Sequence, residues 1–150
     1  LIEFPKLGFN ELDKIIKKIK KNSGGILIID YGYLTQKNKY TLQSIKSHKK
    51  NSIFENIGEA DITSLVNFSL LKEHFKFNRL NVSQIVNQNF FLKKLGILER
   101  AELLSKKMNF REKADLFFRI KRLLDTKQMG NLFKVIFASR LKTKKILGFY

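Results

Sequence analysis

The run over residues 24–32 constrains the fold more than any other stretch of this chain. It places four consecutive branched apolar residues, Ile26 to Ile29, between a pair of glycines and the sequence Asp-Tyr-Gly. Such a run predicts a strand over residues 26–31 that is buried on both faces, as the strands of a parallel sheet are. We expect the apolar strand to stop abruptly at Asp30.

The carboxyl end of this strand is the first candidate site, because open α/β sheets bind ligands just beyond the carboxyl ends of their strands. Asp30 and Tyr31 are candidate catalytic residues there, and Gly32, which would let the backbone turn sharply, is a candidate for the substrate cleft. The Asp30 carboxylate is suited to accept a hydrogen bond from a substrate amine or guanidinium. Its alternative role is that of a turn residue that binds neighbouring backbone amides.

Residues 32–66 show no sustained hydrophobic period, and we expect a long loop there. Long loops in compact domains are often functional. His48 is a candidate catalytic base in this loop. Asp61 and Thr63 are candidates for the substrate cleft, with a turn or a helix entry as the alternative. The sequence has no glycine-rich phosphate loop, metal-ligand spacing or nucleophile elbow, so we expect no metal.

Composition limits the function classes further. The chain has 150 residues, a size typical of one domain, and its 43% hydrophobic content is enough for a core. It has no cysteine, which excludes disulfides and a cysteine nucleophile, and no apolar run long enough to span a membrane. The net charge is +17. Because lysine far outnumbers arginine and is spread along the whole chain, we attribute this charge to a solvated surface and expect no nucleic-acid partner.

The hydrophobic periods of the remaining chain predict alternating helices and strands. The predicted elements are a helix over 10–22, a helix over 67–76, a strand over 79–86, a helical insertion over 87–128 and a strand over 132–139. Asn67 and Asn109 are predicted helix caps, the latter in a capping box with Glu112. Three strands joined through helices make only the edge of an α/β sheet. We therefore expect residues 1–150 to be the carboxyl-terminal portion of a single larger domain.

An ordered set of phrases resembles the MidA family of S-adenosylmethionine-dependent methyltransferases. Residues 24–32 match the family's Gly-Gly, apolar strand and Asp-Tyr-Gly. The other matching phrases are Glu3-Phe4-Pro5, residues 58–71 (GEADITSLVNFSLL), residues 88–97 (QNFFLKKLGI) and residues 129–133 (MGNLF), with His48 in the place of a loop histidine. Asn67 departs from the family, which usually has aspartate there, although both residues are good helix caps.

The resemblance implies an α/β fold. The chain would be the C-terminal part of a seven-stranded Rossmann-like class I methyltransferase sheet, holding the last three strands with a helical insertion before the final one. The resemblance also implies S-adenosylmethionine as cofactor, with contacts expected upstream of this chain. Methyl transfer to a protein arginine nitrogen is the implied activity.

The family's mitochondrial member assists assembly of respiratory complex I. This implies a protein substrate such as a complex I subunit, and a mitochondrial matrix location in a eukaryote or a cytoplasmic one in a bacterium. The sequence is also compatible with a homodimer.

Two other functions stay open. We expect the chain alone to be inactive, and an inactive chain could serve as a non-catalytic assembly factor or binding module for a protein partner. A basic nucleic-acid-binding domain is the less favoured alternative, and it would bind with an affinity that falls steeply with salt.

Overall fold

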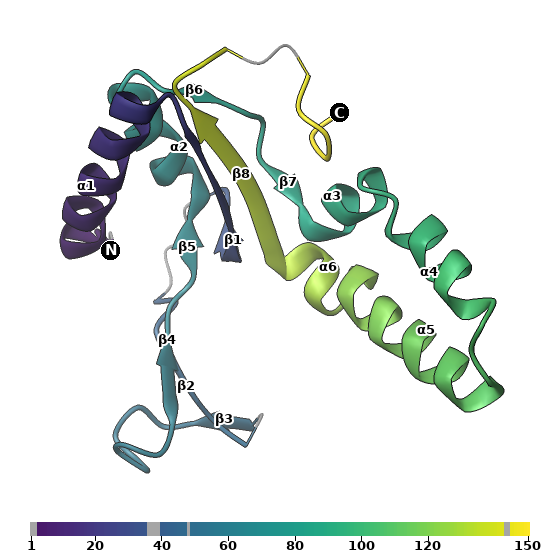
Figure 1. Ribbon diagram of the computed structural model, residues 1–150. Helices are drawn as coiled ribbons and strands as arrows, with labels where there is room; N and C mark the ends of the chain where they lie inside the picture. The colour runs from purple at the N-terminus through teal and green to yellow at the C-terminus, as the bar shows by residue number, and fades with distance from the viewer. Residues whose placement is uncertain (1–2, 36–39, 48, 143–144) are drawn as a thin grey trace.

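The computed structural model describes residues 3–35, 40–47, 49–142 and 145–150, and the predicted catalytic candidate His48 lies outside them. The helices are α1 (Lys6–Asn22), α2 (Phe68–Phe77), α3 (Gln88–Lys94), α4 (Ile97–Ser105), α5 (Phe110–Leu124) and α6 (Met129–Leu132). The strands are β1 (Gly25–Tyr33), β2 (Gln43–Lys46), β3 (Lys49–Asn51), β4 (Asp61–Thr63), β5 (Val66–Asn67), β6 (Asn81–Val82), β7 (Val86–Asn87) and β8 (Phe133–Ser139). The fold is the expected mixed α/β architecture (Figure 1).

The central sheet is built on the long antiparallel pair of β1 and β8 (Figure 1). Its strand order is β5-β1-β8-β6, and β7 also pairs with β8. On the edge of β1 away from β8, β5 adds a short parallel pair at Gly32 and Tyr33. Among the described residues no strand pairs with residues 25–31 on that edge. The sheet therefore ends in an uncovered stretch of its longest strand.

Strand β1 differs from its prediction in two ways. It continues through Gly32 instead of stopping at Asp30, because pairing with β5 keeps the backbone extended, so the sharp turn expected at Gly32 is absent. Its alternate side chains Leu27, Ile29 and Tyr31 are 47%, 43% and 40% exposed. The prediction of a strand buried on both faces is therefore wrong for this chain, in which α1 and α2 cover only the opposite face.

The main core lies between the sheet and the helices α1 and α2 (Figure 1). Its buried side chains are Ile16, Ile19, Phe68, Leu71, Phe75, Leu80, Ile136 and Ala138. Ile26 and Ile28 of β1 pack against this cluster. A polar and aromatic contact joins the two helices, since His74 Nε2 lies 2.8 Å from Asp13 Oδ1 and the ring of Phe9 stacks on His74 at 4.2 Å.

Helix α1 begins at Lys6, before the predicted start at residue 10. The backbone N–H of Phe9 donates to the Pro5 carbonyl at 2.9 Å, which closes an additional turn. The sequence pattern missed this turn because the partner of Phe9 is the His74 ring on α2, which is far away in the chain. Asn67 caps α2 as predicted, and its Oδ1 accepts a hydrogen bond from the Leu70 N–H.

A second, small sheet occupies most of the segment predicted as a loop. Strands β2, β3 and β4 pair antiparallel in the order β3-β2-β4 and project beyond the carboxyl end of β1 (Figure 1). These strands are only three or four residues long, β3 and β4 are largely exposed, and the buried position of β2 is Ser44, so the segment carries no regular apolar alternation. The prediction of a loop over residues 32–66 is therefore wrong in this part.

The strand predicted over residues 79–86 is interrupted, and only β6 and β7 pair with β8. Between them, the Ser83 N–H donates to the Phe137 carbonyl at 2.9 Å, and Ser83 Oγ accepts from the Phe137 N–H at 3.0 Å. The serine side chain thus replaces a backbone acceptor and breaks the regular ladder.

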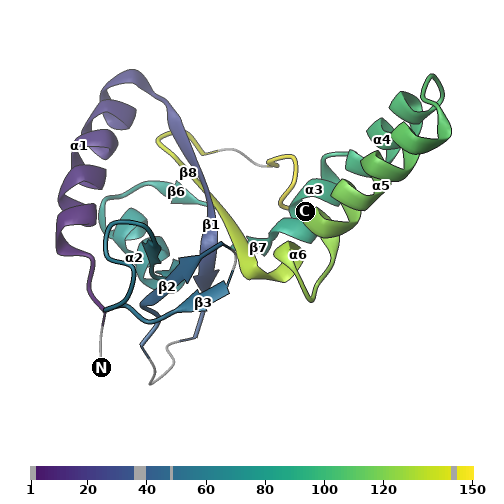
Figure 2. The same cartoon turned by 90° about the horizontal axis from the view of Figure 1, so that it is seen from below.

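The predicted helical insertion contains α3, α4 and α5, and the short helix α6 leads into β8. Helices α4 and α5 form a hairpin (residues 97–124) that extends away from the central sheet in both views (Figures 1 and 2). Its small core consists of Ala101, Ile120 and Leu124. The predicted capping box begins α5, with Asn109 and Glu112 exchanging side-chain-to-backbone hydrogen bonds. In the described part of the chain, no helix is both long enough and apolar enough to cross a membrane.

The second face of β8 is covered by α3 and by the C-terminal segment 145–150. Phe149 of this segment packs with Phe91 and Val135, and the two phenyl rings meet edge-to-face at 5.2 Å. This cover stops at β8 and leaves the outer face of β1 exposed.

We predict that Gly32→Ala strongly destabilises the chain. A Cβ atom at Gly32 would lie 2.4 Å from the Phe68 ring and 2.6 Å from the Val66 carbonyl oxygen, so β5 and α2 would have to move away from β1. Overpacking of this kind costs about 1–3 kcal/mol. Gly24→Ala is the matched control, because nothing lies within 4 Å of its added Cβ. Equal urea unfolding midpoints for the two variants would contradict the close packing at Gly32.

Candidate functional site

The candidate site is the carboxyl end of β1, where several elements meet. The β1–β8 ladder ends there at the Tyr31–Phe133 pair, and β5 joins β1 at Gly32. The rings of Tyr31 and Phe133 lie 4.1 Å apart. Both the β2–β4 sheet and the helical part of the chain leave the central sheet at this end (Figures 1 and 2). Side chains at this position are therefore flanked by two projecting structures.

Asp30 is half-buried near this end of β1. Its Oδ1 accepts a hydrogen bond of 2.7 Å from the Tyr31 N–H, as the turn-like alternative of the sequence reasoning anticipated. Across the ladder, Asp30 is in register with Lys134, whose Nζ donates to the Asn131 carbonyl. The hydrogen bond thus fixes the orientation of the carboxylate, and Lys134 occupies the opposite position on the neighbouring strand.

Tyr31 and Gly32 have different roles in the structure. Tyr31 presents its ring on the exposed face of β1, next to Phe133, and is available to a ligand or to another part of the protein. Gly32 is buried against Phe68 and Val66. Its absent side chain allows the close approach of α2 and β5, so its contribution to a substrate cleft is indirect.

Asp61 and Thr63 lie on β4 and are both exposed. Thr63 Oγ1 accepts a hydrogen bond from Gln43 Nε2 at 3.2 Å, which joins β4 to β2. Within the described residues, no hydrogen bond or ion pair links either residue to Asp30. The structure therefore brings Asp30, Tyr31 and Gly32 together along one strand and places Asp61 and Thr63 on the adjacent sheet.

A polar contact that sequence reasoning missed anchors the chain near this site. The Glu3 carboxylate accepts hydrogen bonds from the Thr41 N–H at 2.8 Å and from Thr41 Oγ1 at 2.6 Å. Thr41 Oγ1 in turn accepts from the Leu65 N–H at 3.0 Å. These bonds hold the charged form of the acid and lower the pKa of Glu3. The Glu3-Phe4-Pro5 phrase was the signal in the sequence, but no periodicity indicates its partner.

A large apolar cavity of about 710 Å³ lies beside the uncovered edge of β1. It is bounded by α1, β1, β5 and α2, and residues along its wall include Leu12, Ile15, Ile28, Val66 and Leu70. Apolar walls of this size next to an unpaired strand edge are suited to packing against a further element.

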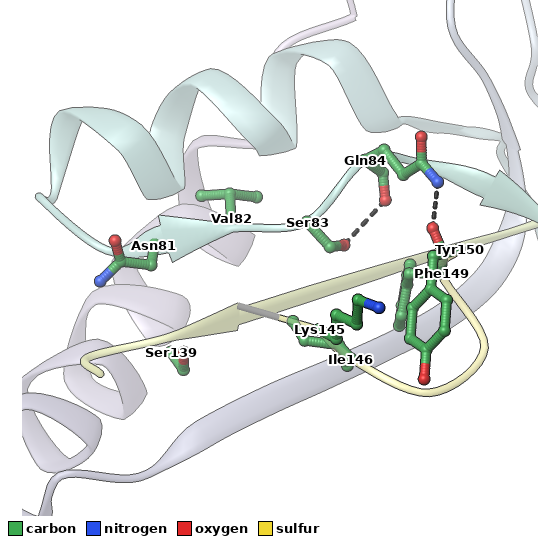
Figure 3. A pocket seen from close by; sticks show the side chains of 9 residues that line it. All are labelled: Asn81, Val82, Ser83, Gln84, Ser139, Lys145, Ile146, Phe149 and Tyr150. Carbon is green, nitrogen blue, oxygen red and sulfur yellow. Dashed lines mark hydrogen bonds between the residues drawn. The ribbon is translucent and has the colours of Figure 1, made fainter. Parts of the chain in front are cut away.

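A smaller cavity of about 190 Å³ lies under the C-terminal segment (Figure 3). Its lining residues are Asn81, Val82, Ser83, Gln84, Ser139, Lys145, Ile146, Phe149 and Tyr150. Gln84 Nε2 donates to the Phe149 carbonyl, which closes the segment over the sheet (Figure 3). Because Ser139 pairs with Gly25 at the amino end of β1, this cavity is separate from the candidate site.

No group of three histidine, cysteine, aspartate or glutamate side chains among residues 3–35, 40–47, 49–142 and 145–150 could hold a metal ion. The chemistry that the described part of the site offers is therefore that of a carboxylate and aromatic rings.

Comparison with known proteins identifies the class to which this arrangement belongs. Residues 2–86 match a family described as "Putative S-adenosyl-L-methionine-dependent methyltransferase". The chain is 31% identical over 136 residues to the Protein arginine methyltransferase NDUFAF7, mitochondrial, of Xenopus tropicalis, a match that covers 88% of this chain and 31% of that protein. It is 30% identical over 135 residues to the Danio rerio protein of the same name, covering 90% of this chain and 31% of that one.

Solved structures show the same fold. A COG1565 superfamily protein from Burkholderia thailandensis superposes with a TM-score of 0.72 at 23% identity, covering 92% of this chain and 38% of the other. A second member from the same organism, bound to S-adenosyl-homocysteine, gives a TM-score of 0.66 at 25% identity and covers 92% and 37% of the two chains.

The sheet and its carboxyl-end site are thus part of a class I S-adenosylmethionine-dependent methyltransferase fold. The chain belongs to the MidA family of these methyltransferases, which confirms the resemblance of its sequence phrases. It spans 31% of the length of the two curated relatives.

We predict that the contact between Glu3 and Thr41 weakens in acid. Because the folded state lowers the pKa of Glu3, this contact stabilises the fold fully above the ordinary carboxyl pKa, and the contribution is lost as the pH falls through the lowered value. An NMR titration of the Thr41 amide should give a midpoint below that of a short peptide with the same sequence. Glu3→Gln, which keeps an acceptor but cannot ionise, should abolish the titration. A midpoint equal to that of the peptide would contradict the assignment.

Proposed function

We propose that this chain forms the carboxyl-terminal part of a methyltransferase domain that transfers a methyl group from S-adenosylmethionine to an arginine nitrogen of a protein substrate. The observation that carries the proposal is the uncovered edge of β1, with an apolar cavity lined by Ile28 and Tyr33, on the strand whose carboxyl end forms the candidate site. The arginine acceptor is supported by the names of the two vertebrate relatives.

The described residues fit the substrate side of such a site. They provide a half-buried carboxylate at Asp30 and the Tyr31 ring, but no glycine-rich loop of the kind that holds a nucleoside cofactor. We therefore assign the cofactor contacts to a part of the domain that pairs with the uncovered edge of β1. Bound there, S-adenosylmethionine would supply a methyl group activated by its positively charged sulfur.

Asp30 would hold the substrate guanidinium through charge-assisted hydrogen bonds. Its bond to the Tyr31 N–H fixes the direction of the carboxylate, so less orientation has to be supplied by the substrate. Transfer would form a bond between the arginine nitrogen and the methyl carbon as the carbon–sulfur bond breaks, with S-adenosyl-homocysteine as the leaving group and the proton of the nitrogen passing to water. The contribution of the chain is alignment of the nucleophile.

Finer expectations belong to the same proposal. The substrate would be a protein such as a respiratory complex I subunit, the location would be the mitochondrial matrix in a eukaryotic cell, and the full protein would be compatible with a homodimer. The mitochondrial location is supported by the names of the relatives.

A non-catalytic binding module is the second candidate, because both projecting structures expose large apolar side chains. On the β2–β4 sheet, the loop between β3 and β4 leaves Phe54 and Ile57 largely exposed. Such groups are suited to a protein partner whether or not methyl transfer takes place.

We predict that Asp30→Asn lowers arginine methylation about 10- to 100-fold, in the chain joined to the amino-terminal part that its relatives possess. This range corresponds to the loss of one charged hydrogen bond, about 1.5–3 kcal/mol. The measurement is transfer of labelled methyl to an arginine-containing protein. Asp115→Asn is the matched control and should retain its rate, since Asp115 is exposed on α5, away from the carboxyl end of β1. Unchanged turnover in Asp30→Asn would exclude Asp30, and no arginine methylation by the unsubstituted protein would contradict the proposed function.

A further inference from the structure

The α4–α5 hairpin carries an exposed aromatic face that the proposed function does not use. Phe110, Phe117 and Phe118 of α5 are 88%, 50% and 72% exposed. At about 100° per residue, these three positions fall within an arc of about 100° on the helix. The buried positions Ile120 and Leu124, which contact α4, lie to one side of this arc. The three phenylalanines therefore define an exposed aromatic face of α5. Lys121 lies within its arc, and Phe117 borders the buried Leu124.

Positive charge lies on and beside the aromatic face. Lys106 and Lys107 lie in the turn that joins α4 to α5, and Arg111, Lys121 and Arg122 lie on the solvent side of α5. All five are exposed, and none forms an ion pair within residues 97–124 or with another described residue. Residues 97–124 contain eight lysines and arginines against four acidic residues, so the hairpin carries a net positive charge. Positive charge beside three exposed phenyl rings favours a partner with negative charge and an apolar interior.

The shape of the hairpin indicates which kind of negatively charged partner fits it. Its turn is the part of the chain that extends farthest from the central sheet on this side in both views (Figures 1 and 2). Neither of the two cavities described above is lined by a residue of the hairpin. A second copy of the chain is disfavoured as the partner, because it would bring the same positive charges close together. A projecting, convex and basic helix end with exposed phenylalanines is instead typical of segments that lie in the headgroup region of an anionic bilayer.

We propose that the α4–α5 hairpin docks the protein on an anionic lipid surface. Phe110, next to the turn, would lie at the boundary between headgroups and acyl chains, and Phe117 and Phe118 would follow along the helix. Lys106, Lys107 and Arg111 would contact the lipid phosphates. This docking does not depend on methyl transfer, because it uses a surface away from the carboxyl end of β1.

Tryptophan fluorescence tests the proposal directly, because the chain contains no tryptophan. Phe110→Trp places a single reporter on the aromatic face of the intact 150-residue chain. Phe77→Trp is the matched control, since Phe77 is 85% exposed at the end of α2. Vesicles of mixed phosphatidylglycerol and phosphatidylcholine, with and without brominated acyl chains, provide the lipid surface, and pure phosphatidylcholine vesicles provide the uncharged comparison. Far-UV circular dichroism confirms that both variants are folded.

The expected result is a blue shift and bromine quenching for Phe110→Trp on the anionic vesicles alone, and no change for Phe77→Trp. In cosedimentation, Lys107→Gln and Arg111→Gln should each weaken vesicle binding about fivefold, which is the effect of one lysine or arginine near an anionic membrane. The matched pair Lys49→Gln and Lys50→Gln on β3 should have a smaller effect.

Three outcomes would overturn the proposal. Equal shifts at the two tryptophan positions, or binding without any shift at position 110, would show that the overall charge of the chain is responsible. Absence of binding to anionic vesicles would contradict docking on lipid and would favour an acidic protein as the partner of the aromatic face.

Discussion

The antiparallel ladder between β1 and β8 joins two segments more than a hundred residues apart, from the Gly25–Ser139 pair to the Tyr31–Phe133 pair. Among the described residues, strands β6 and β7 pair only with β8, and β5 pairs only with β1, so the central sheet depends on this ladder. The helices α1 and α2 cover one face of it, and α3 with the C-terminal segment covers β8 on the other. What stays uncovered is one edge and one face of β1, and both adjoin the candidate site.

The candidate site is organised by contacts between segments that are distant in the sequence. Gly32 allows β5 and α2 to approach β1, and Glu3 links the start of the chain to Thr41 and Leu65 through three hydrogen bonds. These contacts fix the segments that join the β2–β4 sheet to the carboxyl end of β1. In the proposed function, a substrate protein that reaches the carboxyl end of β1 would meet this preformed surface, and the rest of the domain would pair with the uncovered edge of the same strand.

The sequence predicted those parts of the fold that depend on contacts between residues close together in the chain. The caps at Asn67 and Asn109 are side-chain bonds to amides three residues away, and the apolar run of β1 and its Asp-Tyr-Gly end are contiguous. Features with distant causes were missed or misread. The close packing of Gly32 depends on Phe68, the role of Glu3 depends on Thr41, and the exposure of Leu27 depends on where the covering elements stop.

The contiguous Asp-Tyr-Gly phrase was enough to place Asp30 near the carboxyl end of β1. Its role in the reaction stays a prediction. The central claim is that this chain supplies one side of a site whose cofactor is held across the edge of β1. Equilibrium binding of labelled S-adenosylmethionine tests it most directly, measured on this chain alone and on the chain joined to the amino-terminal part found in its relatives. The account predicts binding only by the joined protein. Equally tight binding by the chain alone, or no binding by either, would contradict it.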